Sequence, residues 1–321
     1  MKKLVFNLVL VFFATVIFTS CKKEKVINFE SQIITGLTLE NYPVIDGSTS
    51  TFPLNMVIAC ELLGIEYKWV PHPVESSWSI EPNINKRTSD KLLSKVKSSQ
   101  THGSFVNLIK KDADLILSAR TMSPDEKAIA QSNGVTLIET SIALDAFIFI
   151  VHPTNPITSL TIEQIQDIYM GNITNWKEVG GNDLPIMAYA RNPNSGSQEL
   201  MELMVMRDFD FTYLPISPEI PQLGGMVPVF EKVMENDRAI SYTIYYYKEN
   251  ILRDVKTKTI AIEGIMPDKN TISNNTYPLV ADVYATIRSD LDNSSMAYKI
   301  YEFLQTEKGK QIITKSGYLP Y

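Results

Sequence analysis

Four short segments rich in Ser, Thr and Gly each lead directly into an apolar helical pattern. They begin at Ser48, Thr101, Arg191 and Leu223. A helix N-terminus carries unpaired N–H groups and a partial positive charge, so hydroxyls and glycines placed there let an oxyanion approach and accept several hydrogen bonds. One such segment would be an ordinary helix cap. Several in one chain predict a convergent anion pocket.

The sharpest of these segments places Arg191 four residues ahead of Ser195, with Gly196 and Ser197 following. A guanidinium suits bidentate pairing with an oxyanion. Two hydroxyls and consecutive backbone N–H groups lie close to it in the sequence, so all of these groups could reach one tetrahedral oxyanion. The alternative interpretation is a capped helix beside an unrelated surface arginine.

Two further helix starts could contribute hydroxyl and N–H donors to the same pocket. Ser50, Thr51 and Phe52 precede a helix that has proline in its first turn, and Gly103 and Ser104 lie in a second, weaker segment. For both segments the alternative is a simple N-cap without a ligand.

Arg120 follows a buried-strand pattern, at the end of the strand where ligand sites of α/β proteins gather. It is therefore a second candidate cation for the pocket. It could equally form an ion pair with Asp125 or Glu126, which follow it closely in the sequence.

The sequence offers little support for an enzyme. Its three histidines lie in unrelated contexts, and no paired metal-ligand spacing, G-x-S-x-G turn or P-loop is present. We therefore predict no catalytic residue, no metal site and no cofactor. A phosphatase remains the enzyme alternative, and it would need an activated nucleophile or metal ligands that the sequence does not display.

The N-terminus has the pattern of a bacterial lipoprotein signal. Two lysines precede an apolar run that ends in small residues before Cys21. We predict a signal peptide over 1–20, a lipid on the Cys21 thiol, and a polar tether over 21–35. A plain secretory signal with an accidental cysteine is the alternative.

Composition limits the partners and the architecture. The formal net charge is −6, with a pI near 5.3, which argues against nucleic acid as a partner. An anion site in such a chain must be local. The roughly 290 residues of the mature chain exceed the usual size of one core, so we expect two lobes. Cys60 lies in an apolar run and is predicted to be buried.

Alternating strand and helix patterns predict a layered α/β protein. Helices are expected from Pro53 to Gly64, over 89–96 and over 296–304. Further helices should follow the capping residues of the segments at Thr101, Ser123, Thr161 and Ser195, and the helix after Thr161 should end at Gly171. The segments at Thr161 and Ser195 have the spacing of a capping box, with Gln164 and Gln198 as the reciprocal residues. Strands are expected over 42–47, 67–70, 114–117, 135–138, 143–151, 186–190, 239–247 and 281–287.

Together these segments resemble the phosphate-binding substrate-binding proteins of ABC transporters, which belong to the type II periplasmic binding protein superfamily. The resemblance rests on the order of the motifs and covers nearly the whole mature chain. It is carried by Tyr42 to Ser50, by Ser118-Ala119-Arg120, by Leu160 to Trp176, and by Arg191 with Ser195-Gly196-Ser197.

The resemblance implies two α/β lobes joined by two crossover segments, with the ligand cleft between them. We expect the first lobe to comprise 36–142 plus 248–321 and the second 143–247. Well-known members place an Asp at the position of Arg120, and that difference adds positive charge. The implied ligand-binding residues are Ser50, Thr51, Phe52, Gly103, Ser104, Arg120, Arg191, Ser195, Gly196 and Ser197.

The expected function is capture of inorganic phosphate for an ABC importer by a monomer outside the cytoplasm. Its expected partners are the permease subunits of that importer and a membrane of the cell envelope, reached through the lipid on Cys21. Binding of another tetrahedral oxyanion, such as sulfate or molybdate, is one alternative. A phosphate sensor or surface protein without a permease is another.

Overall fold

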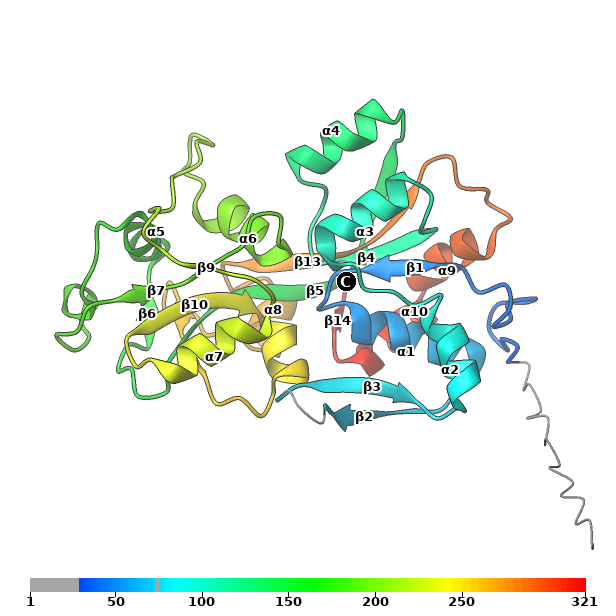
Figure 1. Ribbon diagram of the computed structural model, residues 1–321, viewed down its shortest axis with the longest axis horizontal. Coiled ribbons are helices and arrows are strands. Elements are labelled where there is room, and N and C mark those ends of the chain that lie inside the picture. The colour runs from blue at the N-terminus through cyan, green and yellow to red at the C-terminus, as the bar shows by residue number, and fades with distance from the viewer. Residues whose placement is uncertain (1–28, 73–75) are drawn as a thin grey trace, which may run out of the picture.

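The computed structural model describes residues 29–72 and 76–321, so the predicted signal peptide and Cys21 lie outside the described residues. Its centre is a mixed sheet, with helices on both faces and two lobes side by side (Figure 1). The predicted two-lobed α/β class is therefore confirmed. The strands run in the order β1 (Ile45–Gly47), β4 (Leu115–Ser118), β13 (Val280–Arg288), β5 (Leu137–Val151), β10 (Ala239–Ile244) and β7 (Met187–Ala188), while β11 (Lys258–Thr259) and β14 (Leu319–Pro320) also pair with β5.

The first lobe, on the right in Figure 1, surrounds β1 and β4 with helices. Its best-defined helix, α1 (Phe52–Leu63), begins beside Pro53 and ends at Gly64 in the left-handed conformation, as predicted. Cys60 is buried on α1, also as predicted. The other elements of this lobe are β2 (Tyr67–Pro71), β3 (Trp78–Pro82), α2 (Lys86–Leu93), α3 (Gln100–Ile109), α4 (Pro124–Ser132), α9 (Met296–Leu304) and α10 (Glu307–Ser316).

The second lobe, on the left in Figure 1, is built around β10 and β7. The predicted capping box is present at α5 (Ile162–Met170), where Thr161 and Gln164 bond each other's backbone N–H. The remaining elements are β6 (Ser159–Leu160), the 3-10 helix η1 (Trp176–Val179), β8 (Ala190–Arg191), α6 (Gly196–Leu200), the π-helix η2 (Met201–Val205), β9 (Gln222–Leu223), α7 (Val227–Glu235), the π-helix η3 (Tyr247–Ile251), β12 (Ala261–Ile262) and α8 (Lys269–Ser273).

A single long strand, β5, joins the two lobes. Two separate strands over 135–138 and 143–151 were expected, but the intervening polar stretch continues the strand because β13 satisfies its backbone groups. From Ala146 towards its start, β5 pairs with β13; from Phe147 onward it pairs with β10. The change of partner places the crossover at these two residues.

The chain returns to the first lobe later than the predicted boundary at 247/248. β11 pairs with the end of β5, and β12 pairs with β6, so both belong with the second lobe. The second crossover is therefore β13. The sequence did not indicate this pairing, because the segment after Tyr247 is short of regular structure and its pairing partners lie about a hundred residues earlier in the sequence.

Some predicted bounds were wrong for local reasons. The helix expected over 89–96 begins earlier, because the Asn85 side chain accepts a hydrogen bond from the N–H of Thr88 and caps it. The strand expected over 186–190 divides at Tyr189, since β7 pairs with β10 while β8 pairs with β9. The strand expected over 239–247 ends at Ile244, and the chain then turns into η3.

The predicted tether is shorter than 21–35. Residues 29–35 lie against the first lobe, where Phe29 packs on the core and Ile34 is buried. The Ser31 hydroxyl accepts hydrogen bonds from the N–H groups of Ile33 and Ile34, which fixes this turn. Residues 29–35 therefore belong to the folded first lobe.

Asp145, in the crossover part of β5, is bonded to the turn between β10 and η3. Its side chain is 2% exposed, and Oδ1 accepts hydrogen bonds from the N–H groups of Ala146 and Tyr246. Oδ2 is buried without a hydrogen-bond partner. Desolvation by burial raises the pKa of Asp145 to about 7, and the two N–H donors oppose that shift.

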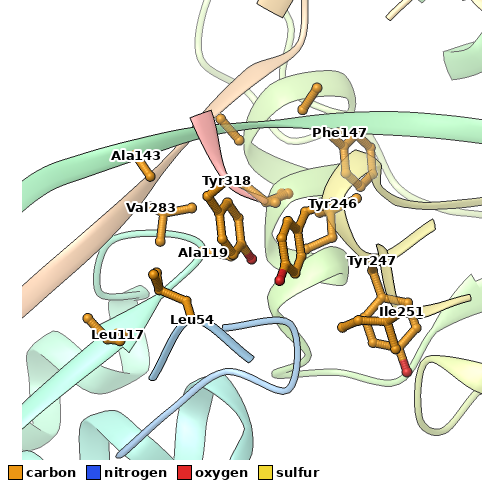
Figure 2. Packing of buried hydrophobic residues seen from close by; sticks show 14 of the residues in the cluster. Leu54, Leu117, Ala119, Ala143, Phe147, Tyr246, Tyr247, Ile251, Val283 and Tyr318 are labelled. Carbon is orange, nitrogen blue, oxygen red and sulfur yellow. The ribbon is translucent and has the colours of Figure 1, made fainter. Parts of the chain in front are cut away.

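Two stacked tyrosines link the turn after β10 to the loop before α1. The ring centroids of Tyr246 and Tyr318 lie 3.6 Å apart at an interplanar angle of 5°. Figure 2 shows these two rings beside each other. The Tyr318 hydroxyl donates to the carbonyl oxygen of Ser50, and the Tyr246 hydroxyl donates to that of Ser316. The C-terminal segment thus ties the crossover to one of the predicted anion-binding segments.

The raised pKa of Asp145 predicts how stability depends on pH. Between its ordinary value of 3.8 and about 7, the folded protein holds the Asp145 proton while the unfolded chain releases it. The free energy of unfolding should therefore fall as pH rises through this window, by at most about 1.4 kcal/mol per pH unit from this group.

Asp145→Asn should remove this contribution, because an amide oxygen can still accept both N–H bonds but does not titrate. Urea unfolding of both proteins at pH 4 to 8 measures the difference. Asp183→Asn, at a carboxyl that is 70% exposed, is the control. An unchanged slope in Asp145→Asn would show that Asp145 stays ionised in the fold.

Candidate functional site: an anion pocket between the lobes

A cavity of about 50 Å³ lies between the two lobes. A cavity needs about 10–15 Å³ to hold one water, so this one has room for roughly four water-sized groups, as a small tetrahedral ion requires. Both lobes contribute to its wall. The lining residues are Ser48, Thr49, Ser50, Gln100, Thr101, Ala119, Arg191, Ser195, Gly196, Ser197, Leu200, Gly225, Met226 and Ile244.

The first-lobe wall is the turn between β1 and α1 together with the start of α3. The hydroxyls of Ser48 and Thr101 are 2.9 Å apart, which joins the two segments. Ser50 is 4% exposed, and its hydroxyl makes no hydrogen bond to any described residue, so it is free to donate into the cavity. Pro53 shapes the first turn of α1, whose N-terminus faces this wall.

Arg191 dominates the second-lobe wall. It is 4% exposed at the end of β8, where its backbone N–H donates to the Tyr242 hydroxyl. Its Nε donates to the carbonyl oxygen of Leu223 at 3.1 Å, and its Nη1 donates to the sulfur of Met226 at 2.8 Å. No carboxylate of the described residues lies within 4.0 Å of this guanidinium. Burial accordingly lowers the pKa of Arg191.

Ser195 begins α6, and its hydroxyl accepts a hydrogen bond from the N–H of Gln198. The reciprocal half of the predicted capping box is absent here. The Gln198 side chain instead accepts a hydrogen bond from the Tyr242 hydroxyl at 2.5 Å, in the buried interior behind Arg191. The capping interaction leaves the hydroxyl proton of Ser195 available to a ligand.

Gly196 allows the two lobes to approach. A Cβ atom at this position would lie 2.6 Å from the hydroxyl oxygen of Thr101, across the cavity in the first lobe. A side chain at 196 would therefore push α6 away from α3 or displace Thr101. The glycine, which the sequence analysis placed among the ligand-binding residues, is required by packing as well as by access to the backbone.

Four predicted site residues do not line the cavity. The Thr51 hydroxyl donates to the carbonyl oxygens of Leu117 and Ser48, so it holds the turn together rather than facing a ligand. Phe52 packs against the core. The Ser104 hydroxyl donates back to the carbonyl of Thr101 within α3. A Cβ atom added to Gly103 would lie 3.2 Å from Cβ of Ser99, so this position faces its own helix start rather than the cavity.

Arg120 also lies away from the cavity wall, because its charge is already paired. Its Nη1 and Nη2 donate to the two carboxylate oxygens of Glu126 at 2.7 and 2.8 Å, and both side chains are buried. The guanidinium also lies over the Phe105 ring. His102 contacts the same carboxylate at 3.1 Å. The ion pair that the sequence left open as an alternative is therefore the observed one.

Several lining residues were absent from the predicted set. Ser48, Thr49 and Thr101 lie in segments that the sequence analysis singled out, but which of the adjacent hydroxyls face the cavity depends on the turn. Gly225 and Met226 belong to the weak segment that begins at Leu223, and Ala119 entered only among the residues that carry the resemblance. Gln100, Leu200 and Ile244 carry no sequence signal for a ligand site.

No cluster of metal-ligating side chains occurs among residues 29–72 and 76–321. In the same part of the chain, none of the helices is sufficiently long and apolar to span a membrane.

The fold and the cavity together are those of a two-lobed binding protein with a small polar pocket between its lobes. Comparison with known families agrees. Residues 84–305 match the model described as a PBP superfamily domain, and the chain belongs to this superfamily. The similarity to phosphate-binding proteins inferred from the sequence is confirmed by its relatives.

Two relatives and one solved structure illustrate this similarity. The "Phosphate-binding protein PstS" of Borreliella burgdorferi is 28% identical over 56% of this chain and 65% of its own length. The protein of the same name in Staphylococcus epidermidis is 27% identical over 74% of each chain. A putative phosphate ABC transporter substrate-binding protein from Clostridium perfringens, solved with bound phosphate, is 24% identical, with a TM-score of 0.64 over 86% of this chain and 98% of its own.

Removing Arg120 should reduce stability without affecting anion binding. Arg120→Ala leaves the Glu126 carboxylate buried without its main counter-charge, which should cost about 3–5 kcal/mol. Lys111→Ala, which breaks an exposed pair with Asp290, should cost about 0–1 kcal/mol and is the matched control. Urea unfolding measures both. Equal losses in the two variants would contradict a structural role for Arg120.

Proposed function

We propose that this protein captures inorganic phosphate outside the cytoplasm and delivers it to an ABC importer. The observation that carries the proposal is Arg191, a buried cation in a pocket between two lobes, with no carboxylate partner among the described residues. A buried charge is costly unless it is paired, so this position calls for an anionic ligand.

The neutral groups around Arg191 suit a tetrahedral oxyanion. Ser50 and Ser195 offer hydroxyl protons from opposite walls, and the N-termini of α1 and α6 add backbone N–H groups and favourable dipoles. The relatives named phosphate-binding protein PstS support phosphate as the anion. Capture would be a closure of the two lobes, with the occupied form recognised by the permease.

Attachment to a membrane would follow from lipid on Cys21. Seven residues separate Cys21 from Phe29, the first described residue, and they would form a short tether between the lipid and a monomeric domain. Expression of Cys21→Ala should release the protein from the membrane fraction while leaving phosphate binding intact. Retention of the variant in the membrane fraction would exclude this anchor.

A second candidate ligand is sulfate or another fully ionised tetrahedral oxyanion. None of the residues that line the cavity carries a carboxylate. A pocket with a carboxylate would repel sulfate and accept the proton of hydrogen phosphate, so its absence from this wall favours weak discrimination between the two anions.

Calorimetric titration of the mature protein with phosphate, sulfate, arsenate and molybdate tests the ligand class. We expect saturable binding of phosphate, tighter than about 1 mM (roughly −4 kcal/mol). Uptake of phosphate by cells lacking the protein tests the transport step, and it should fall at low external phosphate. No binding of any of the four anions would contradict the proposal.

Arg191→Ala should weaken phosphate binding by roughly two to four decades, because it removes the only charged donor of the cavity wall from a desolvated anion. Arg238→Ala makes the same change in net charge elsewhere in the second lobe, where Arg238 contacts Asn236, and should leave affinity within about threefold. Equal affinities of wild type and Arg191→Ala would place the pocket elsewhere.

A further inference from the structure

The sulfur of Met226 contacts two hydrogen-bond donors of the cavity that an anion would use, those of Arg191 and Ser197. It accepts a hydrogen bond from Nη1 of Arg191 at 2.8 Å and lies 3.6 Å from the hydroxyl oxygen of Ser197. All three residues line the cavity between the lobes. Arg191 comes from β8, Ser197 from α6 and Met226 from the residue before α7, so three separate segments converge on this sulfur.

A thioether is an unusual acceptor for a guanidinium. It is neutral, polarizable and only a weak acceptor. Arg191 has no carboxylate partner that could hold it, and its Nε is taken by the carbonyl of Leu223. Met226 therefore gives Nη1 some stabilisation, but far less than an oxyanion would give.

Two glycines precede Met226, and their surroundings are open. Gly225 has a φ of +77°, a conformation that residues with side chains rarely adopt, and an added Cβ on Gly224 would meet nothing within 4 Å. The methionine side chain has three rotatable bonds beyond its backbone. It can leave Arg191 by rotation, without unfolding α7.

We propose that Met226 is a displaceable internal competitor that sets the affinity of the anion pocket. A bound anion takes Nη1 of Arg191 and the Ser197 hydroxyl, and the Met226 thioether must swing away first. This inference rests on the proposed function. A weak acceptor at this position keeps the buried guanidinium oriented, and little free energy is lost when the ligand displaces it. An oxygen acceptor would compete strongly with the ligand.

The test compares Met226→Leu with Met226→Gln, which are close to methionine in size. Leucine removes the acceptor, so phosphate should bind about three- to tenfold more tightly than to wild type, the range of one modest hydrogen bond. Glutamine supplies an amide oxygen in place of sulfur, so phosphate should bind more weakly by at least a similar factor. Met187→Leu in β7, away from this cavity, is the control and should leave affinity unchanged.

A second measurement follows Met226 itself. In protein labelled with ¹³C at the methionine methyl groups, the signal lost in Met226→Leu identifies this residue, and added phosphate should shift it in wild type. If wild type binds no phosphate, the proposed function fails. If wild type binds phosphate while the Met226 signal stays in place, or if the leucine and glutamine variants bind equally well, the competitor role is overturned.

Discussion

The burial of one guanidinium without a carboxylate partner is the constraint on which the site depends. Arg191 is almost fully enclosed between two lobes, and its protein acceptors are one carbonyl oxygen and one thioether. Arg120, which is also buried, instead forms a bidentate ion pair with the carboxylate of Glu126. Arg288, a third buried arginine, also lies within 3.5 Å of a carboxylate, that of Asp290. This contrast supports Arg191 as the buried cation that pairs with a ligand.

The rest of the fold positions the first-lobe wall of the cavity opposite Arg191. β5 passes from one lobe to the other, and Asp145 accepts a hydrogen bond from Tyr246 in the turn after β10. Tyr246 stacks on Tyr318, whose hydroxyl donates to the Ser50 carbonyl, and the side chain of Ser50 lines the cavity. The crossover part of β5 is thus connected to the first-lobe wall by aromatic contacts and hydrogen bonds.

Local signals in the sequence predicted much of this structure. Gly64, Gly171 and the capping pair Thr161 and Gln164 fixed helix ends correctly because each acts within one turn of chain. The bounds of α9 were likewise predicted from helical periodicity. Features that depend on distant partners were missed: the continuity of β5 requires β13, and the late return to the first lobe requires the pairing of β12 with β6.

The candidate site was likewise predicted where local signals define it and missed where it depends on the fold. The segments that would form it were identified, and Arg191, Ser195, Gly196, Ser197 and Ser50 do line one cavity. Which hydroxyl in a run of hydroxyls faces inward depends on the turn: Ser48 and Thr101 line the cavity, whereas the predicted residues Thr51 and Ser104 do not. Arg120 does not line the cavity, because its guanidinium pairs with the buried carboxylate of Glu126. Sequence spacing alone could not decide between this ion pair and a place in the cavity wall.

A crystal structure of the mature protein grown with inorganic phosphate tests the central claim most directly. The account predicts a tetrahedral anion between the N-termini of α1 and α6, with an oxygen within hydrogen-bond distance of Arg191 and with Met226 rotated off the guanidinium. Density for phosphate at another place, or a Met226 sulfur still on Arg191 in crystals saturated with phosphate, would contradict it.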